Sequence, residues 1–150
     1  MISDRPSMYL AFAGQQAMAR IHEVFSAYGL KQGSSRALSV LAELGPLSQK
    51  ALQAALGCDP SIVVAILNQL EEMGLAERRR DPADRRRHIV TLLPAGVDIA
   101  KRIAEDLTVA EESFFAALTP GEIETLVGLL AKVTEGSEFV AADTRADDAC

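Results

Sequence analysis

QKALQAALGCDPSIVVAILNQLEEM (49–73) contains two apolar, helix-forming runs separated by Gly-Cys-Asp. The first run predicts a helix over 49–56, with Ser48 as its N-cap because a serine hydroxyl can accept a backbone N–H of the first turn. A glycine ends that helix, and Pro60 takes the first position of the next one, where its missing N–H would have had no partner. The second helix is predicted over 60–73. Two short helices joined by so tight a turn predict a helix-turn-helix.

The second helix has an apolar face and an outward face. Asp59 is predicted as its N-cap. Its inward residues recur at helical spacing: Val63, Ile66, Leu67 and Leu70. In a helix-turn-helix the second helix lies in the major groove of DNA, so its outward residues are candidate DNA contacts. Together with the residues at the two helix starts, these candidates are Ser48, Pro60, Ser61, Ile62, Val64, Ala65, Asn68 and Gln69.

A β-hairpin with an arginine-rich tip is predicted next. LAERRR (75–80) and HIVTLL (88–93) read as strands joined by the polar loop DPADRRR (81–87). Six arginines against three acidic residues give residues 77–88 a net charge of +3, on a chain whose formal net charge is −6. A cationic loop beside a helix-turn-helix can lie along phosphates or enter a narrow minor groove. This is a winged helix, and its predicted wing contacts are Asp84, Arg85, Arg86 and Arg87.

Asp84 stands out among these candidates because its carboxylate would repel phosphate. We predict that it holds the guanidinium of Arg86, two residues on, in a fixed pose. Arg79 is expected to point away from the duplex, since strand residues alternate between two faces. His88 is interpreted as a strand residue, with a phosphate contact as the alternative.

Amphipathic helices flank the winged helix on both sides. Their predicted ranges are 7–28, 35–44, 94–116 and a last helix that begins at Pro120. The last helix has the clearest start signal, because Thr119 and Glu122 form a capping box. The fold class is therefore mostly α with a small β-hairpin.

Composition narrows the function classes. At 150 residues and 49% hydrophobic the chain fits one globular domain, and no apolar run approaches the roughly 20 residues that a membrane-spanning helix needs. The first residues have too brief an apolar run and too few basic residues for a good signal peptide. This favours a cytoplasmic protein without a membrane partner. No phosphate-binding glycine loop, nucleophile elbow or metal-spaced His/Cys set is present, so we expect neither an enzyme nor a cofactor or metal site.

The winged-helix region also resembles a known family. GLAERRR, DPADRR and PAG, within the run from Leu47 to Gly96, look like the winged helix of the MarR family of bacterial transcriptional regulators. The resemblance implies a homodimer that places two winged helices on a pseudo-palindromic double-stranded DNA site. The domains it implies are a dimerisation region at 7–30 and 95–135, a DNA-binding domain at 35–94 and a mobile acidic tail at 136–150.

The same resemblance implies how such a protein works. It predicts a sequence-specific regulator, a repressor, with helix 60–73 in the major groove and wing 81–87 on the minor groove or phosphates. It also implies a small aromatic or anionic effector, bound in a crevice between the dimer helices and the winged helix, that weakens DNA binding. The ligand residues stay unassigned, because Ser35 stands where many relatives carry an aromatic residue.

Base readout is expected to differ from that of many relatives. Ile62 stands where they carry a polar residue, and Gln69 lies near the position of a common arginine. Hydrogen bonds from Ser61 and Asn68, together with thymine-methyl contacts by the apolar residues of the helix, would then supply the readout.

Some alternatives remain open from the sequence. The wing could dock an acidic protein, which would make the chain an assembly module that does not bind DNA. Cys58 is interpreted as a small buried residue, with a redox switch as the alternative because a helix N-terminus lowers the pKa of a thiol. His22 is interpreted as a surface or dimer-interface residue, with an effector contact as the alternative.

Overall fold

The computed structural model describes residues 5–134 and is mostly helical, with one small antiparallel sheet. Its elements in chain order are α1 (Pro6–Ala27), α2 (Gln32–Leu44), β1 (Leu47–Ser48), α3 (Gln49–Leu56), α4 (Pro60–Glu72), β2 (Ala76–Arg80), β3 (His88–Leu92), α5 (Pro94–Phe114) and α6 (Pro120–Thr134). The predicted fold class is confirmed. The predicted acidic tail, 136–150, lies outside the described residues.

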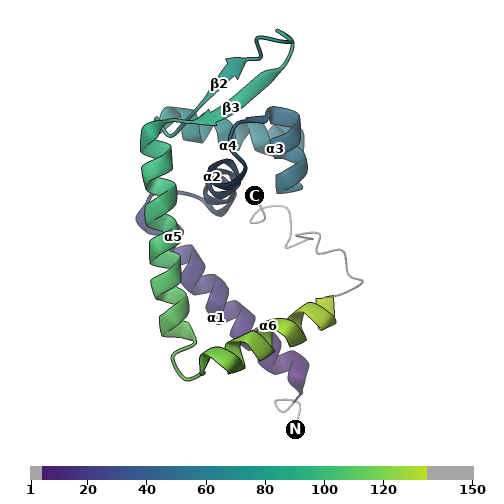
Figure 1. Ribbon diagram of the computed structural model, residues 1–150, viewed down its shortest axis with the longest axis vertical. Coiled ribbons are helices and arrows are strands. Elements are labelled where there is room, and N and C mark those ends of the chain that lie inside the picture. The colour runs from purple at the N-terminus through teal and green to yellow at the C-terminus, as the bar shows by residue number, and fades with distance from the viewer. Residues whose placement is uncertain (1–4, 135–150) are drawn as a thin grey trace.

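The described chain has two parts joined by α5. Elements α2 to β3 form the winged helix at the top of Figure 1, and α1, α5 and α6 form the lower part. The α5 helix runs from the sheet into the lower part and packs along α1. The hydroxyl of Tyr28, the C-cap residue of α1, donates a hydrogen bond of 2.6 Å to the Asp106 carboxylate of α5, which ties the two helices together beside the winged helix. This bond raises the pKa of the Tyr28 hydroxyl above its usual range.

The core of the winged helix consists of the predicted inward faces of its helices. All four inward residues of α4, Val63, Ile66, Leu67 and Leu70, are buried, as are Leu52 and Leu56 of α3. Helical spacing also predicts Leu44 and Ala55 as inward residues of the helices expected at 35–44 and 49–56, but both are exposed.

The sheet has a third strand that the sequence analysis did not predict. Its order is β1-β3-β2, and the two-residue strand β1 pairs antiparallel with β3, Leu47 opposite Val90 and Ser48 opposite Ile89. Two residues are too few to show a periodicity, so only the partner strand defines this element. The pairing joins the start of α3 to the base of the wing, which we define as β2, loop 81–87 and β3.

The helix caps agree with the sequence signals in two of three cases. The Ala51 N–H donates to the Ser48 hydroxyl at 3.1 Å, and Thr119 and Glu122 exchange the hydrogen bonds of a capping box. Asp59 does occupy the N-cap of α4, but its side chain accepts no capping bond. The Asp59 backbone carbonyl accepts the N–H groups of Ile62 and Val63, and the carboxylate takes no part in the cap.

Within residues 5–134 no single helix is long and apolar enough to cross a membrane. The pair α3 and α4 passes that test only by combined length and composition, with a bend of 109° between them. The buried residues of the two helices belong to the core of the winged helix: Leu52 and Leu56 of α3, and Val63, Ile66, Leu67 and Leu70 of α4.

Candidate nucleic-acid interface

The outer face of α4 carries most of the residues predicted to enter the major groove. The exposed ones are Pro60, Ser61, Val64, Ala65 and Asn68. Ile62 is half-buried and packs against the core, so only part of its side chain faces outward. The exposed face therefore offers a serine hydroxyl and an asparagine amide among small apolar groups.

Gln69 is directed toward α2 and not wholly outward. Its Oε1 accepts a hydrogen bond of 2.5 Å from the hydroxyl of Ser34, a residue that is only 1% exposed. A buried hydroxyl needs a partner, and a glutamine at the edge of the helix face supplies it. The carbonyl oxygen of Gln69 is thus occupied inside the protein, which reduces what this side chain can offer to a base.

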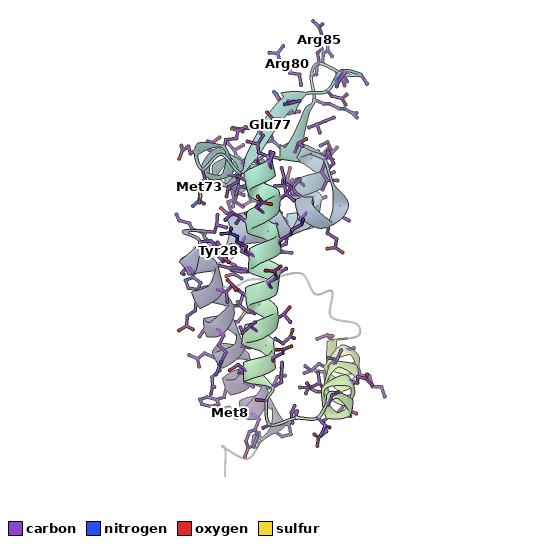
Figure 2. The ribbon with its side chains drawn as sticks, turned by 60° about the vertical axis from the view of Figure 1, so that its left-hand side comes forward. Met8, Tyr28, Met73, Glu77, Arg80 and Arg85 are labelled. Carbon is purple, nitrogen blue, oxygen red and sulfur yellow. The ribbon has the colours of Figure 1, made fainter. Side chains whose placement is uncertain are left out.

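The wing projects from the body, and its arginines divide into two groups. Arg78, Arg79 and Arg87 form ion pairs with Glu71, Glu77 and Asp84. Within residues 5–134 Arg80, Arg85 and Arg86 have no ion pair and are exposed. Figure 2 shows Arg80 and Arg85 pointing away from the rest of the molecule at the wing tip. Pairing thus concentrates the uncompensated positive charge at the tip.

The predicted pairing of Asp84 with the Arg86 guanidinium is wrong. One carboxylate oxygen accepts the backbone N–H of Arg86 at 3.0 Å, and the other lies 3.3 Å from Nε of Arg87. The loop turns at this point, because the Arg87 N–H donates to the Asp84 carbonyl at 2.9 Å. That turn carries the Arg86 side chain away from the carboxylate and brings Arg87 to it. Asp84 therefore shapes the loop and leaves the Arg86 guanidinium unpaired.

A second acidic residue supports the same loop. Asp81 accepts the Ala83 N–H at 2.8 Å through its carboxylate, and its own N–H donates to the Arg87 carbonyl at 2.9 Å. The two aspartates thus order the loop backbone, which explains acidic residues in a predicted phosphate-binding segment.

Arg78 links the wing to α4. The carboxylate of Glu71 on α4 accepts the Arg78 backbone N–H at 2.9 Å, its Nε at 3.0 Å and its terminal nitrogen at 2.5 Å. These bonds hold the pKa of Glu71 below its usual value and raise the pKa of Arg78. The same terminal nitrogen donates to Oδ1 of Asn68 at 2.6 Å.

A groove of about 520 Å³ lies between α3 and the wing. It brings Ser48 together with Arg86 and Arg87, and it adds Lys50 and Gln53, which the sequence analysis did not single out. Lys50 is exposed on the first turn of a helix whose amide groups favour anions. The signal in the sequence that could have identified Lys50 is its position in the first helical turn after the Ser48 cap. Arg80 was also missed, although it belongs to the arginine run.

A second groove, of about 590 Å³, lies where α2 and β3 of the winged helix meet α5. Its lining is mostly apolar, with polar groups from Ser39, Glu43, Thr91 and Lys101. His22 is exposed on α1 and does not line this groove. This location corresponds to the crevice between helical region and winged helix that the resemblance implied.

The remaining sequence candidates add no catalytic arrangement. Cys58 is half-buried before α4 and packs against the core. Among residues 5–134 no cluster of His, Cys, Asp or Glu could hold a metal ion.

Comparison with known proteins decides the family. The MarR family profile matches residues 30–88, from two residues before α2 to the first residue of β3. The putative transcriptional regulatory protein for the hcr operon of Thauera aromatica is 37% identical over 117 residues, which are 78% of this chain and 70% of that protein. The chain belongs to the MarR family. It is a transcriptional regulator and not an enzyme.

This MarR-family chain is also similar to two solved structures that concern DNA binding. BpsR of Bordetella bronchiseptica, whose DNA binding is regulated by 6-hydroxynicotinic acid, is 26% identical with a TM-score of 0.73, over 90% of this chain and 96% of that one. A mutant MarR from E. coli, complexed with operator DNA, is 22% identical with a TM-score of 0.72, over 85% of this chain and 91% of that one. The second likeness shows the shared fold.

Proposed function

We propose that this MarR-family regulator is a dimeric repressor that binds a pseudo-palindromic double-stranded DNA operator in the cytoplasm. In this proposal α4 enters the major groove and loop 81–87 lies on the minor groove or the phosphates. The observation that carries it is the group of unpaired arginines, Arg80, Arg85 and Arg86, at the projecting tip of a chain with a net charge of −6. The exposed Ser61 and Asn68 on the adjoining helix would add base contacts.

The direct test is the salt dependence of binding to duplexes that the wild-type protein selects from a randomised DNA library. Each phosphate contact releases counterions, so the logarithm of the affinity is expected to fall linearly with the logarithm of the salt concentration. Fluorescence anisotropy across a KCl series measures the slope. Failure to select any duplex, with binding to an acidic protein instead, would favour the assembly-module alternative.

The dimer is supported by apolar side chains that the described chain leaves uncovered. They lie on the first turns of α1 and along α6: Met8, Tyr9, Leu10, Phe12, Val127, Leu129 and Val133. The α6 helix has no buried residue. Large apolar side chains left exposed on the terminal helices mark an interface, and a second copy that interlocks its terminal helices would cover them. The two recognition helices would then lie about 34 Å apart, one turn of the duplex.

We predict that Phe12→Glu combined with Val127→Glu makes the protein monomeric. Both side chains are at least 60% exposed here, and burying two carboxylates in an apolar interface is strongly unfavourable. Sedimentation velocity at micromolar concentration should give twice the 16.1 kDa chain mass for the wild type and one chain mass for the variant. Met73→Glu, which alters an exposed apolar residue at the end of α4, is the control and should remain dimeric. A wild-type monomer would contradict the dimer.

We further propose that the groove between α2, β3 and α5 binds a small aromatic or anionic effector. Lys101 supplies a cation at the rim of a mostly apolar lining, which suits an aromatic carboxylate. Ligand binding there would change the angle between α5 and the winged helix, and so the spacing of the two recognition helices.

6-Hydroxynicotinic acid is a suitable first probe for this groove. It is expected to lower the affinity for the selected duplex, and Lys101→Met is expected to remove this response while the ligand-free affinity stays unchanged. Anisotropy titrations with and without the probe give both quantities. Equal responses of the wild type and Lys101→Met would contradict the assigned groove.

A further inference from the structure

The hydrogen bonds of the Arg78 side chain are all with residues of α4. From β2 its guanidinium reaches two residues one turn apart on the recognition helix, Glu71 and Asn68, at 2.5–3.0 Å. Its side chain is only 24% exposed, and the Glu71 carboxylate also accepts the Arg78 backbone N–H. Three hydrogen bonds from the guanidinium and one from the backbone N–H therefore fix Arg78 in one position, unlike the unpaired arginines at the wing tip.

The contact with Asn68 determines which way its amide points. A guanidinium carries only donors, so the asparagine atom 2.6 Å from it must be the carbonyl oxygen. The amide nitrogen, with its two N–H donors, is then on the other side of the side chain. Asn68 is exposed on the outer face of α4, at the spacing of Ser61 and Ala65. It therefore presents donors, and not an acceptor, to whatever lies against the helix.

This orientation has a consequence for base recognition. An asparagine that is free to rotate reads adenine with both amide atoms, by accepting from N6 and donating to N7. An asparagine whose oxygen is turned toward Arg78 presents its N–H donors outward. The major-groove edges that offer acceptors without an adjoining donor are guanine N7 and O6 and thymine O4.

We propose that Arg78 is a positioning residue that holds Asn68 as a hydrogen-bond donor, so that the recognition helix prefers guanine or thymine to adenine at the base that Asn68 faces. The proposal rests on the proposed DNA-binding function and specifies the readout of that same surface. Glu71 contributes by fixing Arg78.

The experiment compares the duplexes that each variant selects from the same randomised library. The position faced by Asn68 is identified as the one where Asn68→Ala loses base preference. Wild type should select guanine or thymine there. Arg78→Met, which keeps the length of the side chain and removes its donors, should raise the frequency of adenine about fivefold or more relative to the wild type.

Asn68→Asp provides a test that does not disturb the fold. The aspartate has the shape of asparagine and keeps Arg78 as a partner, but its outward atom is an acceptor where asparagine has a donor. Its preference should therefore move to cytosine, whose N4 is a major-groove donor. This change of base identity would not follow from a merely structural role of the Arg78 contacts.

Arg80→Met is the matched control. It removes the same charge from the same face of β2 but contacts neither Asn68 nor Glu71, so affinity should fall without a change in the preferred base. Equal base preferences in the wild type, Arg78→Met and Asn68→Asp would overturn the inference. So would a wild-type preference for adenine. If the wild type selects no duplex, the proposed DNA-binding function fails, and the inference fails with it.

Discussion

Gly96→Ala is expected to destabilise the protein by about 3 kcal/mol, the largest stability effect predicted for a single added methyl group. Gly96 is buried in the first turn of α5, and a Cβ built on it would lie 2.0 Å from the carbonyl oxygen of Leu75 and 2.9 Å from its carbonyl carbon. The obstacle is backbone and cannot rotate aside. The same Leu75 carbonyl accepts the Leu93 N–H at 2.9 Å, which holds the two segments together.

Thermal unfolding followed by circular dichroism measures this effect. For a chain of this size the expected loss corresponds to a decrease in Tm of about 10 °C. Gly121→Ala is the control, because no atom lies within 4 Å of a Cβ at that position in α6. It should change stability by less than about 1 kcal/mol. Equal losses for the two variants would show that the close approach of α5 to Leu75 does not restrict residue 96.

Arg86→Ala is expected to lower the affinity for every duplex about a hundredfold. The Asp84 carboxylate leaves the Arg86 guanidinium unpaired and orders the backbone beneath it, so the side chain is available to phosphate or the minor groove. A charge-assisted hydrogen bond is worth about 1.5–3 kcal/mol, and a dimer loses two of them. The slope of log affinity against log salt should also decrease by about two, one phosphate contact in each half-site.

Two comparisons make the Arg86 prediction specific. Arg79→Ala removes the same charge, but Arg79 is paired with Glu77 at 2.6 Å, so a much smaller loss is expected. Ser61→Ala should change the preference among duplexes and leave the salt slope unaltered, because a serine on the face of α4 contacts bases without releasing counterions. Anisotropy titrations on selected and scrambled duplexes separate the two effects. Similar losses for Arg86→Ala and Arg79→Ala would show that ion pairing in the wing does not decide which arginines contact DNA.

Local signals in the sequence predicted the secondary structure of the winged helix well. The Ser48 cap, Pro60 at the start of α4 and the capping box before α6 each involve residues a few positions apart, and all three occur in the structure. The buried face of α4 also agrees with its helical spacing, because a packed helix repeats its contacts every three to four residues. Predicted strands 75–80 and 88–93 differ from β2 and β3 by one residue each.

Errors and omissions arose where two side chains could compete for one partner, or where the partner is distant in the chain. Both Arg86 and Arg87 are close enough to Asp84 in the sequence to pair with it, and the turn of the loop brings the Arg87 side chain to its carboxylate. Gln69 was placed on the outward face, yet its oxygen is bonded to Ser34, 35 positions away. The two-residue strand β1 exists only because β3 lies beside it.

By itself the sequence determined that a helix-turn-helix is followed by a cationic hairpin, because caps, turns and hydrophobic repeats depend on neighbouring residues. Only the tertiary structure decided which charges remain available and how the recognition surface is oriented. The bonds from Arg78 to Glu71 and Asn68, and the approach of Gly96 to Leu75, join separate elements. Such contacts depend on the angles and distances at which helices and strands pack, and residue spacing along the chain does not contain them.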